Sequence, residues 1–308
     1  MNKVSMVIGT VTILCYLLLG CAKKNDDYPQ WAINNQGQIV CGKKGIEGID
    51  IGTELKSISA EGEYVVVIDG FFDPANPYMQ DVVVNIDSVS AYIESHKNPN
   101  MVLGEHPYYV TGIIAGDSDN RYQTVLQDVR IFYIPIDVQN LDVEYVLSQL
   151  TLAESLGIQV VNCSFVLNEF NQRLLDYIQN SKMLYVCAIG NDGRNEIRFP
   201  AAISCNNVVS VVGCDNGGLC SIYSNYSEEA DIAAPGESIL CRTHNVGKYE
   251  FASGSSLATA YVSSVCLYIA MNTEGDASQI KCQLLENSKS IYSLKGKVNG
   301  GRFLRLPE

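Results

Sequence analysis

An aspartate, a histidine and a serine stand in surroundings that suit nucleophilic catalysis. Asp69 ends an apolar, strand-like run, His106 opens a helix-like segment, and Ser256 opens a long apolar segment. A serine hydroxyl becomes a strong nucleophile when an imidazole takes its proton and a carboxylate orients that imidazole. Asn191 follows another apolar run, where its amide could bind a developing oxyanion. These four residues predict acyl transfer by an Asp–His–Ser triad.

Each of the four residues also has an ordinary structural explanation. Asp69 could be a turn or capping carboxylate, and His106 could be a histidine near the start of a helix. Ser256 could be a helix N-cap, and Asn191 could be a turn residue. Their occurrence together, in this order, favours catalysis over four separate structural roles.

The elements that would position these residues alternate along the chain. Strand-like runs are predicted at 64–68, 81–86, 129–136, 159–164, 183–189 and 208–213. Helical patterns are predicted at 106–115, 143–156, 174–180, 256–271 and 277–286. Such alternation predicts a mostly parallel sheet with helices on both faces. In such sheets the chemistry lies at the carboxyl ends of strands, where Asp69 and Asn191 fall.

Four segments around these residues resemble the motifs of the subtilisin family of serine peptidases. As they stand here, they are Val65-Val66-Val67-Ile68-Asp69-Gly70, His106-Pro107-Tyr108-Tyr109-Val110-Thr111-Gly112, Ala188-Ile189-Gly190-Asn191 and Gly254-Ser255-Ser256-Leu257-Ala258-Thr259. The order Asp, His, Ser along the chain separates this family from two convergent triads. Flanking segments such as Phe199-Pro200 and Gly300-Gly301-Arg302 agree, so the resemblance covers roughly residues 30 to 306.

The resemblance implies an α/β fold, a subtilisin-like three-layer sandwich with a mostly parallel sheet and helices on both faces. It implies a serine endopeptidase with Asp69, His106 and Ser256 as its triad and Asn191 as oxyanion donor. The substrate would be a peptide or protein, and no cofactor or metal is expected. Family members often bind structural calcium, but the sequence has no contiguous loop of oxygen ligands like an EF-hand.

The chain departs from the family pattern close to these motifs. Tyr109 replaces the second histidine of the His motif, and Ala260 and Tyr261 replace the proline and histidine after the serine. Pro107 takes the first helical position, where a missing N–H costs nothing. These departures indicate a cleft of different shape. They leave open an inactive scaffold that binds exported peptides, or an acyl-enzyme that passes its acyl group to an amine.

The resemblance also locates the pocket for the acyl-side residue, the one whose carbonyl is attacked. The pocket would lie between the Ser164–Val166 and Ala188–Asn191 segments, with Arg198 at its floor. A guanidinium there would favour Glu or Asp through a charge-assisted pair. In the alternative, Arg198 turns outward and pairs with Asp192 or Glu196.

The N-terminal segment has the composition of an export signal. Lys3 supplies a basic start, residues 4–19 are almost wholly apolar, and Leu18-Leu19-Gly20-Cys21 resembles the lipobox of bacterial lipoproteins. Cys21 would then be lipidated and would anchor an exported protein on the periplasmic side or at the cell surface. An uncleaved anchor helix and an ordinary signal peptide with a chance cysteine are the alternatives. The chain would thus divide into a signal peptide, a tether and a peptidase domain: residues 1–20, 21–29 and 30–308.

Composition restricts the class of partner. The chain has 308 residues, a net charge of −13 and 47% hydrophobic residues, enough for a sizeable core. No basic stripe is visible, which argues against nucleic acid and favours a soluble, monomeric body. The remaining histidines, His96 and His244, lie in polar stretches and are expected in solvent. The stretch between Cys21 and Asp69 is too short for a separate pro-domain, because Trp31 onward already matches the catalytic domain.

Eleven cysteines are many for an exported enzyme. Cys163 and Cys187 sit in apolar, strand-like runs and are expected to be buried thiols. Cys205, Cys214 and Cys220 sit near loops and could form a bridge in an oxidising compartment. The sequence has no C-x-x-C pair, so no structural zinc site is predicted.

Overall fold

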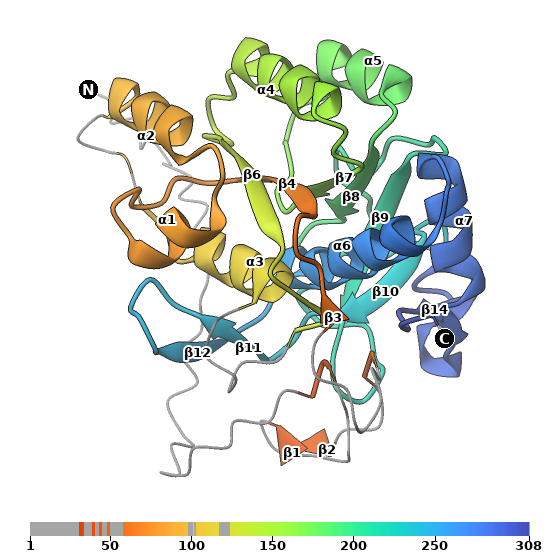
Figure 1. Ribbon diagram of the computed structural model, residues 1–308. Helices are drawn as coiled ribbons and strands as arrows, with labels where there is room; N and C mark the ends of the chain where they lie inside the picture. The colour runs from red at the N-terminus through yellow and green to blue at the C-terminus, as the bar shows by residue number, and fades with distance from the viewer. Residues whose placement is uncertain are drawn as a thin grey trace, which may run out of the picture.

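The structure is a computed structural model that describes residues 31–33, 39–40, 43–44, 48–49, 58–97, 101, 103–116 and 124–307 (Figure 1). Its centre is an eight-stranded sheet in the order β13-β14-β10-β9-β8-β7-β4-β6. All neighbouring strands are parallel except β13 and β14. In sheet order the strands span Lys289–Ser290, Arg302–Phe303, Ile232–Pro235, Val208–Cys214, Leu184–Ala188, Val160–Cys163, Tyr64–Asp69 and Arg130–Pro135.

Helices cover both faces of this sheet. The longer ones are α3 (His106–Ala115), α4 (Val143–Ser155), α5 (Gln172–Asn180), α6 (Ser255–Asn272) and α7 (Ala277–Glu286). Helices α4 and α5 lie together at the top of Figure 1 and share one apolar core, whereas α3, α6 and α7 share the other. The predicted three-layer α/β fold is confirmed.

Strand β4 shows how one strand serves two cores. Val65 and Val67 pack on the α6 side, while Val66 and Ile68 pack on the α4 side. Side chains alternate along a strand, and a parallel sheet covered on both faces therefore needs a continuous apolar run. The run ends at the carboxyl edge with Asp69, the first charged side chain after the run.

Short elements complete the described part of the chain. They are β1 (Ile39–Val40), β2 (Lys43–Lys44), β3 (Ile58–Ser59), α1 (Pro77–Val82), α2 (Ile86–Ser95), β5 (Leu126–Gln127), β11 (Ile239–Arg242), β12 (Tyr249–Ala252), and the 3-10 turns η1 (Tyr292–Leu294) and η2 (Asn299–Gly301). Strands β11 and β12 form an antiparallel hairpin beside α3. The predicted signal peptide (1–20), the tether (21–29) and Cys21 lie outside the described residues.

The strand predicted at 81–86 is wrong, because this segment joins α1 to α2. Asn76 caps α1 by accepting a hydrogen bond from the Tyr78 N–H at 3.0 Å, and Pro77 fits the first turn. The valine run has high strand propensity, but Val83 forms only one isolated bridge, to Ile131. Residues 81 and 82 complete α1 and α2 begins at Ile86, so the valine run is interrupted before a strand can form.

No disulfide joins any two of the described cysteines. Cys163 and Cys187 are buried on neighbouring strands, as predicted. The bridge that the sequence allowed among the other three is not formed. The Cys205 thiol donates to the Asn207 side chain at 2.9 Å and the Cys214 thiol to a backbone carbonyl at 3.1 Å. Cys220 is half-buried in an isolated antiparallel bridge to Cys214, and its thiol donates to the Ser221 carbonyl at 3.6 Å.

A buried polar contact ties the sheet to α6. Asn162 on β7 is fully buried, and its amide donates to the Ser263 hydroxyl at 3.0 Å. The side-chain amide oxygen of Asn162, Oδ1, accepts a hydrogen bond from the Ser164 hydroxyl at 2.8 Å. Both partners are buried as well, so the amide cannot be replaced by water without opening the core.

We expect Asn162→Ala to lower the free energy of unfolding by about 1–3 kcal/mol, because two buried hydroxyls lose a partner. Denaturant unfolding followed by fluorescence measures the loss. The control is Asn272→Ala, which removes an exposed amide at the end of α6 and should change stability by less than about 0.5 kcal/mol. Equal losses of unfolding free energy in Asn162→Ala and Asn272→Ala would show that the buried contact adds no stability beyond that of an exposed amide.

Candidate active site

Asp69, His106 and Ser256 meet although they are far apart in the sequence. The His106 Nδ1 atom lies 2.8 Å from Asp69 Oδ1, and Nε2 lies 2.7 Å from Ser256 Oγ. The three residues come from the end of β4, the first turn of α3 and the first turn of α6. In this geometry the imidazole can take the hydroxyl proton while the carboxylate holds the other ring nitrogen.

The carboxylate of Asp69 is buried and only partly compensated. Its side chain is 5% exposed. Oδ1 also accepts the Gly70 N–H at 2.6 Å, whereas Oδ2 is buried without a hydrogen-bond partner. A buried negative charge with few donors favours a positive charge nearby. The neighbouring imidazole is the group that can supply it.

The pKa of His106 reflects two opposing effects. Burial alone would lower it, but the negative charge of Asp69 and the hydrogen bond to that carboxylate outweigh burial. The pKa of His106 is therefore raised above the ordinary value of 6.5. The side chain remains 31% exposed, so a substrate can reach the ring edge. The raised pKa makes this imidazole a stronger base than a free histidine.

Asn191 lies beside the first turn of α6, with a fixed orientation. Its Oδ1 accepts the Ser255 N–H at 2.8 Å. The Nδ2 hydrogens of the same amide are not used in this contact. Gly254 has no side chain between the two groups. A Cβ atom added there would lie 3.2 Å from Ser256 Oγ and 3.6 Å from Asn191 Nδ2. The glycine thus keeps open a space that the hydroxyl and the amide both border, where a carbonyl oxygen could sit.

Ser164 follows β7 and contacts the backbone of the nucleophile candidate. Its Oγ lies 3.1 Å from the Ser256 carbonyl oxygen and is 2.8 Å from Asn162 Oδ1. Ser164 is 6% exposed. It therefore holds the start of α6 against the end of β7, and little of its surface is open to a substrate.

Arg198 is held between loops by acidic and amide side chains. Nη2 lies 3.0 Å from Asp192 Oδ2, Nε lies 3.4 Å from Glu196 Oε1, and Nη1 donates to Asn168 Oδ1 at 3.2 Å. The contacts with Asp192 and Glu196 are the ion pairs that the sequence analysis gave as the alternative to a substrate-binding role for Arg198. The side chain is only 21% exposed, however, so it does not turn out into solvent. Its charge is compensated within the protein, which weakens the expectation of an acidic acyl-side preference.

The residues that depart from the family motifs are mostly buried side chains. Tyr109 and Tyr261 are buried, and Ala260 is fully buried within α6. The Tyr109 hydroxyl donates to the Glu250 carboxylate on β12. Because α6 continues unbroken through Ala260, the changes alter the packing of α3 and α6 and leave the triad contacts intact.

One pair next to the site was missed by the sequence analysis. Glu105 directly precedes His106, and its carboxylate accepts the His244 backbone N–H at 2.7 Å and contacts the His244 ring. His244 is exposed, as expected from its polar stretch, although its ring also contacts Glu105. The two residues are 139 positions apart, and neither lies in a recognisable motif. Only the packing of the β11–β12 hairpin on α3 brings them together.

Among the described residues, no three His, Cys, Asp or Glu side chains gather so as to hold a metal ion. The structural calcium that the resemblance allows has no such acidic cluster there. No helix within the described ranges combines the length and apolarity needed to cross a bilayer.

Relatives that this chain resembles are named as proteases. The cell wall-associated protease of Bacillus subtilis (strain 168) is 27% identical over 86% of this chain and 30% of its own length. Thermitase of Thermoactinomyces vulgaris is 31% identical over 49% of this chain and 55% of its own length. The chain thus spans about a third of the first relative and about half of the second.

Solved structures show the same fold at low sequence identity. A cold adapted subtilisin-like serine proteinase has a TM-score of 0.69 and 19% identity, with 90% of this chain and 98% of that chain covered. The prenylagaramide maturation protease PagA has a TM-score of 0.61 and 23% identity, with 80% and 90% covered. The profile of the Peptidase_S8 family matches residues 60–298, which is most of the sequence. This chain belongs to the subtilase family.

Proposed function

We propose that the chain is a serine endopeptidase that hydrolyses peptide bonds through an acyl-enzyme on Ser256. The observation that carries the proposal is the continuous pair of hydrogen bonds from Asp69 through His106 to Ser256, at 2.8 and 2.7 Å. Membership of a protease family supports the same reaction class. The enzyme acts on peptides or proteins as a monomer.

The residues have the following roles. His106 takes the proton of Ser256 while Oγ attacks the carbonyl carbon of the scissile bond. The Asn191 amide and the backbone N–H of Ser256 bind the oxyanion, and Asp69 stabilises the imidazolium. His106 then gives its proton to the leaving amine. Water repeats the same steps on the acyl-enzyme and releases the product.

The second candidate function is an inactive scaffold that binds exported peptides. It would need a broken relay or a blocked oxyanion space. His106 contacts both Asp69 and Ser256, and the space beside Gly254 is open. Both observations argue against an inactive scaffold. Transfer of the acyl group to an amine has no further support, because Ala260 is buried.

We further propose that the protein is exported and anchored to a membrane by lipidated Cys21. The support is the sequence of residues 1–28 alone: a basic start, an apolar run, the Leu18-Leu19-Gly20-Cys21 segment and a polar tether. A tether of this composition would hold the peptidase near the surface without fixing its orientation.

Ser256→Ala should abolish peptide hydrolysis and labelling by a fluorophosphonate probe, because no other group replaces the attacking hydroxyl. The loss of a triad nucleophile in a subtilisin is about 10⁶-fold in turnover, and a loss of that order is expected here. Casein cleavage and probe labelling measure it. Ser148→Ala, an exposed serine on α4, is the control and should behave as wild type. Labelling of the Ser256→Ala protein would contradict the assignment.

Activity should fall as the pH drops through the pKa of His106, because only the neutral imidazole accepts a proton. The charge of Asp69 raises that pKa above 6.5, so the acid limb should lie above this pH. In Asp69→Asn the limb should move to lower pH, and the rate should fall by about 10⁴-fold. The pH dependence of kcat/KM, measured with an activated ester as substrate for the wild type and Asp69→Asn, gives both the position of the acid limb and the fall in rate. An unchanged limb in Asp69→Asn would mean that another group titrates.

The mature protein should begin at Cys21 and carry acyl chains on that residue. Mass spectrometry of the N-terminal peptide, and partition of the protein with membranes, measure this directly. Cys21→Ala should leave the protein uncleaved or released, while Ser256 stays reactive to the probe. An N-terminal peptide with unmodified Cys21 would leave only the two alternatives to lipidation.

A further inference from the structure

Two loops flank the catalytic serine candidate. They follow β7 and β8, which are neighbouring parallel strands. The β7 loop is held to the start of α6 by the contact of Ser164 Oγ with the Ser256 carbonyl oxygen at 3.1 Å. The β8 loop is held there by Asn191, whose Oδ1 accepts the Ser255 N–H at 2.8 Å. Both loops therefore lie against the first turn of α6, and the region between them, called the slot below, adjoins Ser256.

The backbone at Arg198 and Phe199 closes the far end of this slot. The Arg198 N–H donates to the Ile189 carbonyl of the β8 loop at 3.1 Å. The Leu167 N–H of the β7 loop donates to the Phe199 carbonyl at 2.9 Å. One short segment is thus hydrogen-bonded to both loops, and the Arg198 side chain starts between them.

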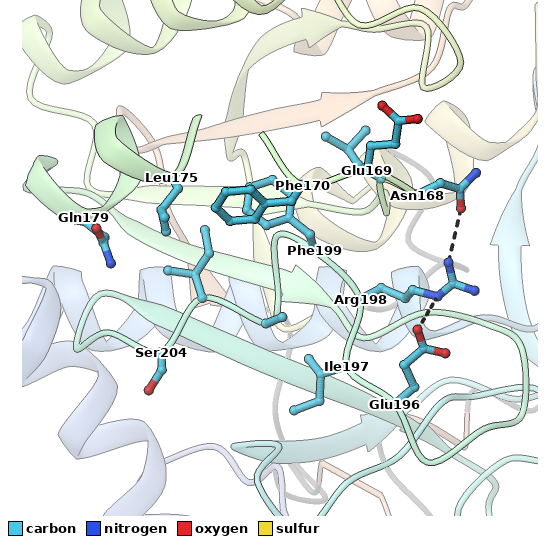
Figure 2. A pocket seen from close by; sticks show the side chains of 13 residues that line it. Asn168, Glu169, Phe170, Leu175, Gln179, Glu196, Ile197, Arg198, Phe199 and Ser204 are labelled. Carbon is cyan, nitrogen blue, oxygen red and sulfur yellow. Dashed lines mark hydrogen bonds and ion pairs between the residues drawn. The ribbon is translucent and has the colours of Figure 1, made fainter. Parts of the chain in front are cut away.

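The Arg198 side chain fills the space between the loops. A Cβ atom added to Gly190 would lie 3.0 Å from Arg198 Cγ, so the aliphatic stem runs close to the backbone just before Asn191. The guanidinium contacts Asn168 on the β7 loop and Asp192 on the β8 loop, and Glu196 Oε1 lies 3.4 Å from Nε, an ion-pair distance without a hydrogen bond. Figure 2 shows Arg198 between Asn168 and Glu196. Charge-assisted contacts on three sides fix the side chain in place.

A pocket of about 480 Å³ is lined in part by Arg198 (Figure 2). Arg198, Asn168 and Glu196 line one end of it, and no triad residue lines it. Its remaining wall has an apolar part, with Phe170, Leu175, Ile197, Phe199 and Ile203, and a polar part, with Glu169, Gln179 and Ser204. The pocket could hold a bulky side chain, and Arg198 both lines it and spans the two loops from Asn168 to Asp192.

We propose that Arg198 is a specificity-determining residue that shuts this slot and restricts the acyl-side residue to a small side chain. A large side chain could enter only by displacing the guanidinium from three polar partners. Because Asp192 and Glu196 already compensate its charge, the arginine offers no free cation to an acidic side chain. The inference rests on the proposed function, since it concerns the peptide whose carbonyl Ser256 attacks.

Peptide substrates that differ only in the acyl-side residue, Ala, Leu, Phe or Glu, test the proposal. Wild-type kcat/KM should be at least about 10-fold higher for Ala than for Leu or Phe. Arg198→Ala should join the slot to the pocket and raise kcat/KM for Leu and Phe by about 10-fold or more. The value for Ala should change by less than about 3-fold. Arg173→Ala, an exposed arginine paired with Glu144, is the matched control and should keep the wild-type pattern.

A double variant separates size from charge. Asp192→Asn with Glu196→Gln keeps the arginine in the slot but frees its charge, so Glu should gain while Leu and Phe stay poor. Titration with the fluorophosphonate probe gives the concentration of reactive Ser256 in every variant. Absence of labelling in the wild type would overturn the proposed function itself. Normal labelling with equal wild-type cleavage after Ala and Phe would overturn only the role of Arg198, even if Arg198→Ala did not fold.

Discussion

The docking of the first turn of α6 against the ends of β7 and β8 is the constraint on which the rest of the site depends. The Gly190 N–H donates to the Ser255 hydroxyl at 3.3 Å, and Asn191 accepts the Ser255 N–H. On the other side, Ser164 contacts the Ser256 backbone. These contacts fix the nucleophile, the amide and the slot between the loops in one unit, so each is placed by the same packing. A shift of this turn would move all of them together.

The histidine is placed by a separate layer of contacts. Helix α3 packs against α6 and against the β11–β12 hairpin, and the approach is close at Gly112, where a Cβ would lie 3.2 Å from Arg242 Cβ. Tyr109 and Glu250 join the same helix to β12, and Glu105 joins its start to His244. The imidazole therefore depends on the hairpin as well as on Asp69. Two independently anchored parts must meet within hydrogen-bond distance for the relay to form.

The alternation of apolar runs was enough to predict the fold class, and the family-like motifs singled out Asp69, His106 and Ser256, which lie within hydrogen-bond distance of one another. A buried strand that ends in Asp69 and a long apolar helix that begins with Ser256 are visible in the sequence itself. The valine run at 81–86 misled the prediction, because its first two residues complete α1 and α2 begins at Ile86. The surroundings of Arg198 could not be predicted either. Asn168 lies 30 positions away, and only the parallel pairing of β7 with β8 brings its loop to the arginine.

The place of Ser256 in its helix explains why this hydroxyl is available at all. Helix α6 is almost wholly buried, yet it carries several hydroxyl side chains. Thr259, Ser263 and Ser264 each donate to the carbonyl four residues earlier, at 2.8 to 3.2 Å, and so satisfy themselves within the helix. Ser256 stands in the first turn, where the residue four positions earlier belongs to β12. Its hydroxyl has no such helical acceptor and is free to meet His106. A nucleophile in a buried helix must therefore sit in the first turn, where the geometry of the helix leaves its proton to the base.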